Sequence, residues 1–211
     1  MSFGMETFLM KIFRILFPLL SIAGVMLFAS CTTTTNLGSK KYTVRAFKPH
    51  NPDNVSVRVS TSTQNIYVME GSRLLMAVQG CVGTSATPTP KGRFTIYSKL
   101  KNKRRISQPG AGYPMAYWCE FQPAYGFHEG FVHPRPRTHG CIRMHKEAAA
   151  RFYALVKIGT PVYIASTQPQ DKEFGHFVTP LDQSKDPDPP MSVMMSPAWF
   201  QDPAGPLLID G

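Results

Sequence analysis

The sequence lacks the paired cysteines and histidines from which most zinc sites are built. Neither a Cys-x₂-Cys pair nor a His-x₃-His pair occurs among its 211 residues, and such spacing is what brings two ligands to one metal. The chain also has no apolar run of the roughly 20 residues that a membrane-spanning helix needs, and no internal repeat. These absences favour one globular domain with extensions at its ends.

The N-terminus has the three parts of a secretory signal peptide. Lys11 and Arg14 supply positive charge, Ile15–Ala29 is a short apolar core, and Ser30 is the small residue at the boundary. We predict that residues 1–30 are a signal peptide and that the protein is exported to the cell envelope. A retained anchor helix is the alternative.

The end of this segment predicts a lipid anchor. "LFAS" followed by Cys31 resembles the bacterial lipoprotein box, whose cysteine is lipidated and becomes the first residue of the mature chain. An ordinary signal peptide cut near Ser30 is the alternative. We predict lipidation of Cys31, which would hold the protein on a membrane facing the periplasm, and a polar tether over residues 31–54.

Acidic residues are scarce relative to basic ones. The chain has 23 Lys and Arg against 13 Asp and Glu, and without residues 1–30 its net charge is +9. Nucleic acid is the usual partner of such a charge. For an exported protein, however, the anionic polymers within reach are those of the envelope and wall, to which the charge gives a non-specific attraction.

Residues 55–165 predict one mostly β domain, for which α+β is the alternative label. Short runs of β-branched and aromatic residues have strand length, and Glu70-Gly71 is a hairpin signal. Apolar residues at helical spacing over 145–159, ending at Gly159, predict one main helix directly after the histidine and cysteine motif. The predicted strands cover residues 55–60, 64–69, 73–80, 93–100 and 160–165.

The C-terminal part and two cysteines are less constrained. Residues 166–211 contain too much proline for a packed core, so we predict an extended tail that Trp199 and Phe200 could dock onto the domain. Cys81 and Cys119 form either a disulfide or two buried thiols, because sequence gives no pairing geometry.

Four histidines and a cysteine lie close together after Phe127. Their spacing argues against zinc, because Pro134 and Pro136 stiffen the segment and only His139 and Cys141 would point the same way in an extended stretch. Nucleic acid is disfavoured because the segment lacks aromatic residues on which bases stack. We therefore expect no metal, no organic cofactor and no nucleic-acid partner. The five residues are His128, His133, His139, Cys141 and His145.

The same segment has the parts of a nucleophilic site built on Cys141. Gly140 lets the backbone approach a substrate closely, and the N–H groups of Gly140 and Cys141 could hold an oxyanion. A histidine could take the thiol proton and return it to a leaving amine. The helix start near Lys146, together with nearby histidine and arginine, predicts a lowered pKa for the Cys141 thiol.

"THGCIRM" resembles the S/T-H-G-C-x-R/N signature of the L,D-transpeptidase (YkuD-type) catalytic domain. The resemblance extends over residues 64–165 and includes "TPTPKGRF", "YPMAYW", "GFHEG" and "KIGTPVYI". It implies the β-sandwich-like catalytic fold of that family for residues 55–165. Glu129 departs from the family pattern, because glycine is frequent at that position.

By this resemblance Cys141 is the nucleophile, His128 is the base, and His139 is a second catalytic histidine. The backbone carbonyl of Glu129 would orient His128. Cys141 would attack the diamino-acid carbonyl of a wall tetrapeptide, expel D-alanine and form a thioacyl enzyme that an amine of a stem peptide or a protein resolves. The remaining oxyanion or substrate-binding candidates are Thr138, Gly140, Arg143 and Tyr117.

Two other functions stay open at this point. A hydrolase would use the same site with water as the acceptor, and a wall-binding module would have the fold without catalysis. We interpret His133 and His145 as non-catalytic and Cys119 as a residue that fills a strand.

Overall fold

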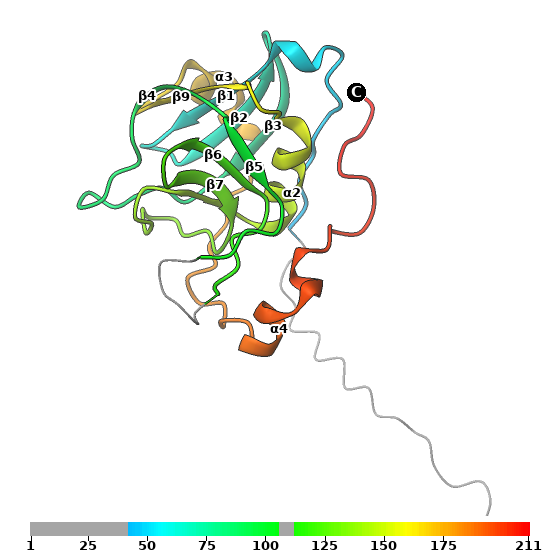
Figure 1. Cartoon of the computed structure of the whole chain (residues 1–211). Helices are drawn as coiled ribbons and strands as arrows, with labels where there is room; N and C mark the ends of the chain where they lie inside the picture. The colour runs from blue at the N-terminus through cyan, green and yellow to red at the C-terminus, as the bar shows by residue number, and fades with distance from the viewer. Residues whose placement is uncertain (1–41, 106–111) are drawn as a thin grey trace, which may run out of the picture. The chain divides into compact units, whose positions relative to one another are not determined.

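The computed structural model describes residues 42–105 and 112–211 (Figure 1). The predicted signal peptide and Cys31 lie outside the described residues. The described residues contain two β-sheets. Their strands are β1 Val55–Ser60, β2 Asn65–Glu70, β3 Arg73–Gln79, β4 Gly92–Thr95, β5 Ser98–Leu100, β6 Trp118–Gln122, β7 Tyr125–Glu129, β8 Ile142–Met144 and β9 Pro161–Ala165.

The first sheet has the order β3-β2-β1-β9-β4 and the second has the order β5-β6-β7-β8. Strands β1 and β9 are parallel, as are β7 and β8, whereas the other neighbours are antiparallel. In Figure 1 the green strands of the second sheet lie in front of the cyan strands of the first. The predicted fold class is confirmed: the protein is mostly β, with one main helix after the cysteine motif.

The core lies between the sheets because alternate residues of each strand point inward. Val55, Val57 and Val59 of β1 are almost fully buried. From the second sheet, the Phe127 ring lies 5.3 Å from that of Phe121 and 4.5 Å from that of Phe152 on α2 (Lys146–Leu155). Since Phe127 points into the core, the next residue of β7 must point to the opposite face of its sheet.

Two features of the chain differ from the predicted strands. Residues 93–100 do not form one strand, because the chain crosses there from β4 in the first sheet to β5 in the second. The Ile96 N–H donates to Thr160 O and the Tyr97 N–H donates to Glu120 O, so neighbouring residues bond to different sheets. The second difference is β8, a three-residue strand that separates the cysteine motif from α2.

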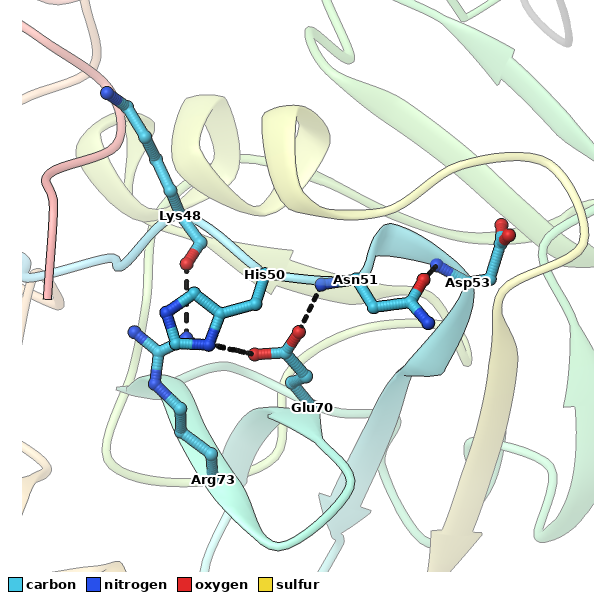
Figure 2. Close-up of polar contacts among 6 residues, drawn as sticks. All are labelled: Lys48, His50, Asn51, Asp53, Glu70 and Arg73. Atoms are coloured by element: carbon cyan, nitrogen blue, oxygen red, sulfur yellow. Dashed lines mark hydrogen bonds and ion pairs between the residues drawn. The ribbon is translucent and has the colours of Figure 1, made fainter.

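The segment before β1 is packed, so the prediction of a tether up to residue 54 is wrong for residues 42–54. The Phe47 N–H donates to Leu75 O on β3, and Ala46 is 2% exposed. Glu70 holds the turn that leads from this segment into β1. Its carboxylate accepts hydrogen bonds from the Asn51 N–H and from Arg73 Nη1, and His50 Nδ1 lies 3.8 Å from Glu70 Oε2 (Figure 2). The hydrogen bond from Asn51 lowers the pKa of Glu70.

Residues 166–211 also differ from the predicted extended tail. They contain the short helices α3 (Pro169–Phe174) and α4 (Met191–Met195) and two 3₁₀ turns, Gly175–Phe177 and Pro197–Phe200. Phe200 is only 7% exposed. The C-terminal segment therefore packs against the domain at a residue that the sequence analysis named for this contact. Pro197 follows shortly after α4 and limits that helix, whereas α3 begins with Pro169 and runs directly into the turn Gly175–Phe177.

None of the helices within residues 42–105 and 112–211 combines the length and the apolar character needed to cross a membrane.

Candidate active site

Thr138 builds the turn that carries the cysteine. Its hydroxyl donates to Cys141 O at 2.6 Å and accepts from the Gly140 N–H at 3.1 Å. Gly140 has φ +111°, and a Cβ there would lie 2.2 Å from Tyr125 Cε1. The turn therefore requires glycine at 140 for its backbone conformation and for space.

The loop before β4 holds this turn in place. The Thr138 N–H donates to Val82 O and the Thr84 N–H donates to Thr138 O, at 3.1 and 3.0 Å. At Gly83 a Cβ would lie 2.9 Å from Gly140 Cα, so the two glycine backbones are in close contact. The conformation of the motif is thus fixed from a segment about 55 residues earlier in the chain.

His128 is a buried, neutral imidazole on β7. Its side chain is 5% exposed, and burial, reinforced by the charges of Arg143 and Lys103, lowers its pKa to about 4, against the opposing effect of the Glu129 carbonyl. The Nδ1 atom lies 2.7 Å from Glu129 O. A carbonyl can only accept, so the proton is on Nδ1, and Nε2 is the nitrogen with a free lone pair.

The parallel pairing of β7 and β8 brings Cys141 to the same sheet face as His128. His128 pairs with Arg143. An ideal continuation of this register past the start of β8 sets Cys141, two residues earlier, beside Gly126 and on the same side. Ideal strand spacing puts the two α-carbons about 8 Å apart. At Gly126 a Cβ would lie 2.9 Å from the Trp118 ring, so glycine at this position leaves room for the indole.

Cys141 is a half-buried thiol, and its pKa differs from the sequence prediction. The Sγ atom lies 3.6 Å from Ala124 O. Burial raises the pKa of the thiol above its ordinary value, although the Gly126 backbone, Arg143 and Lys103 act in the opposite direction. The predicted lowering is wrong because β8 separates Cys141 from α2, and the field of a helix terminus falls off within one turn.

Arg143 is a charged residue that acts on both His128 and Cys141. It lies beside His128 in the register of β7 and β8, and a Cβ at Gly130 would lie 3.0 Å from its Cδ. Its guanidinium lowers the pKa values of both His128 and Cys141. The arrangement therefore provides a positive charge close to both reactive groups.

Two of the predicted substrate-binding roles need correction. The Gly140 N–H already donates to the Thr138 hydroxyl. Of the two backbone N–H groups proposed to bind the oxyanion, the Cys141 N–H therefore remains. Tyr117 is 1% exposed and belongs to the core. Its hydroxyl donates to Gln201 O and Asp202 Oδ1, so it holds the C-terminal segment and does not line a groove.

The other histidines and cysteines of the prediction differ from this pair in exposure and contacts. His139 is exposed on the turn. His145 is the N-cap of α2 and accepts from the Glu147 N–H at 3.2 Å. Cys81 and Cys119 are free and buried, so they are two thiols and no disulfide links them. Burial raises the pKa of Cys119 to about 12, in spite of Lys99 nearby.

Lys103 and Ala124, two residues near the site, escaped the sequence analysis. The Trp118 ring lies 5.8 Å from His128, and Lys103 Nζ lies 3.9 Å from the centre of the Trp118 ring. Ala124 has φ +66°, which is strained for a residue with a Cβ. In the sequence, Pro123 favours a tight turn at "QPAY", but alanine gives no signal for a positive φ.

Among residues 42–105 and 112–211, His, Cys, Asp and Glu form no group of three or more that could hold a metal ion.

Comparison with known proteins identifies the family. The model of the L,D-transpeptidase catalytic domain matches residues 54–164. A Bacillus licheniformis protein named as an L,D-transpeptidase, YkuD, is 32% identical over 122 residues, which cover 54% of this chain and 68% of that protein. The chain belongs to the L,D-transpeptidase (YkuD-type) family. The match includes His128 and the whole Thr138–Arg143 motif, and residues 166–211 lie outside it.

Solved L,D-transpeptidase structures are also similar. One from Mycobacterium smegmatis is 20% identical with a TM-score of 0.47, and the alignment covers 53% of this chain and 58% of that one. One from Stackebrandtia nassauensis is 20% identical with a TM-score of 0.48, and 63% of each chain is covered. This chain therefore spans less than two thirds of either structure.

Proposed function

We propose that the protein is a peptidoglycan L,D-transpeptidase that acts through a thioacyl intermediate on Cys141. The observation that carries the proposal is the state of His128, a neutral imidazole whose Nδ1–H is bound to Glu129 O. The Nε2 atom of His128 can accept a proton. His128 is on β7, which pairs with β8, the strand that directly follows Cys141. Membership of the L,D-transpeptidase family supports wall peptides as the substrate class.

Acylation begins with a protonated thiol, because burial raises the pKa of Cys141. His128 takes the Sγ proton as sulfur attacks the carbonyl carbon of the diamino acid. The carbonyl oxygen becomes an oxyanion that the Cys141 N–H can hold. When the C–N bond breaks, D-alanine leaves with the proton from His128, and a thioester on Cys141 remains.

The second half of the reaction reverses these proton transfers. An amine from another stem peptide, or from a protein, gives a proton to His128 as it attacks the thioester carbonyl. The Cys141 sulfur leaves and regains the proton. Arg143 is positioned to bind a substrate carboxylate or to stabilise the developing charge, and the exposed His139 is available to contact substrate from the solvent side.

The experiment that tests this function uses tetrapeptide-bearing muropeptides with an added amine. Cross-linked dimers or amine adducts are the products expected of a transpeptidase, whereas tripeptide alone would make the protein a hydrolase of the same site. Cys141→Ala should abolish turnover. Cys119→Ala is the matched control, because it removes a buried thiol from a strand outside the site. Turnover that survives in Cys141→Ala would refute Cys141 as the nucleophile, whereas no turnover by the wild type would support a non-catalytic module.

The N-terminal segment completes the proposal. Residues 1–30 act as a signal peptide, Cys31 is lipidated, and the anchor places the catalytic domain, residues 55–165, at the wall from a membrane facing the periplasm. Labelling cells with a clickable fatty acid tests this, since Cys31→Ser should lose the label. A label that persists in Cys31→Ser would contradict the anchor and leave the catalytic proposal untouched.

A further inference from the structure

The C-terminal segment contacts the end of β7, next to the proposed base. Trp199 Nε1 donates to Glu129 Oε2 at 2.9 Å, and Lys146 Nζ on α2 donates to Trp199 O at 2.9 Å. Glu129 follows His128 directly, and its own carbonyl accepts from His128 Nδ1. One residue therefore connects the C-terminal segment with the histidine.

Several further contacts show that residues 191–202 are firmly attached to the domain. Arg104 donates to the carbonyls of Met194 and Met195, at 3.1 and 3.0 Å, and its guanidinium lies 4.8 Å from the centre of the Phe200 ring. Met194 and Phe200 are each 7% exposed. At the far end, Asp202 pairs with Lys101 at 2.8 Å and accepts from Tyr117.

Glu129 needs this attachment because it is a buried carboxyl. The residue is 9% exposed, and burial raises its pKa to about 7, with Trp199 and Lys146 opposing the shift. An ionised carboxylate at this depth is costly unless a donor satisfies it. Without the indole N–H the carboxylate would move toward water, and the backbone carbonyl that holds His128 belongs to the same residue.

We infer that Trp199 and Glu129 are positioning residues for catalysis: the indole N–H holds the Glu129 side chain, and the Glu129 backbone keeps His128 in the tautomer with Nε2 free. This role rests on the proposed function, and it extends the working site into residues 166–211, outside the matched L,D-transpeptidase domain. The Glu129 N–H and the Gly130 N–H also bond to Ala116 O and Met144 O. The Trp199 contact therefore adds a side-chain restraint to a backbone that is already paired.

The inference is tested with Trp199→Phe, which keeps an aromatic ring and removes the N–H donor. Val193→Ala is the control, because Val193 is exposed on α4 of the same segment. Long-range proton–nitrogen NMR on the full mature protein gives the tautomer of His128 without any substrate. We expect a single Nδ1–H tautomer in the wild type and in Val193→Ala, and a mixture of tautomers in Trp199→Phe.

Kinetics on muropeptides supply the second readout. Misplacing a catalytic group costs roughly 10- to 100-fold, so kcat of Trp199→Phe should fall by that factor with KM within about twofold. Glu129→Gln keeps an acceptor for the indole and should retain the tautomer, whereas Glu129→Leu should lose it. An unchanged tautomer or an unchanged kcat in folded Trp199→Phe would overturn the inference. If the wild type turns over no muropeptide, the proposed function fails and the NMR comparison alone decides the positioning role.

Discussion

Glu129→Gln provides a thermodynamic test of how deeply this carboxyl is buried. Its pKa is raised from the ordinary 4.5 to about 7, chiefly by burial. The folded protein therefore binds a proton that the unfolded chain releases between these pH values, and stability falls as the pH rises through this window. A tenfold change in a proton-binding constant corresponds to about 1.4 kcal/mol, so the loss of stability across the window amounts to about 3 kcal/mol.

Glutamine has a similar shape, accepts from Trp199 and does not titrate. The variant and the wild type should therefore have similar stability near pH 4.5, and the variant should be more stable by about 3 kcal/mol near pH 8. Urea unfolding at several pH values, followed by circular dichroism, measures the difference. Glu173→Gln is the control, because Glu173 is exposed on α3, and it should show no such trend. A Glu129→Gln advantage that stays constant with pH would refute the reasoning.

Three other predictions concern the site and its supports. Gly140→Ala should lower the free energy of unfolding by about 1–3 kcal/mol and turnover by at least about tenfold, because the added Cβ would meet Tyr125. A variant as stable as the wild type would contradict the turn that we describe. Alkylation of Cys141 by iodoacetamide, followed by peptide mass spectrometry, should accelerate with pH to beyond pH 9, because burial raises the thiol pKa above 9.0; a plateau between pH 6 and 8 would indicate a preformed thiolate. Tyr117→Phe removes the hydroxyl bonded to Gln201 and Asp202, which should cost about 1 kcal/mol and speed limited proteolysis after residue 190; unaltered cleavage would count against the attachment.

The sequence predicts the first sheet well for a physical reason. In β1 the period-two alternation matches the buried positions, and Gly71 at φ +59° makes the hairpin after Glu70. Residues 93–100 look like one strand because alternation does not reveal which sheet a residue pairs with. Strand β8 has only three residues, too few for a pattern, and its omission led to the wrong expectation for the Cys141 pKa.

The sequence predicted which residues form the site, but it predicted their burial and contacts less well. The motif names Cys141 and His128, but the depth of burial that makes the imidazole neutral and keeps the thiol protonated comes from contacts between distant segments. Tyr117 illustrates the same limit. It lies within the "YPMAYW" stretch, whose family resemblance made it a substrate-binding candidate, whereas its contacts with residues 201 and 202 place it in the core. A proline-rich composition likewise concealed that Trp199 reaches Glu129.

Trapping the acyl group on the protein would decide whether Cys141 is the nucleophile. The mature protein is incubated briefly with a tetrapeptide muropeptide, quenched in acid, and analysed by intact mass and by peptide mapping. We expect a thioester on the peptide that contains Cys141, release of one D-alanine per acyl group formed, and neither event in Cys141→Ala. An acyl group on another residue, or D-alanine release by Cys141→Ala at the wild-type rate, would contradict the proposed mechanism.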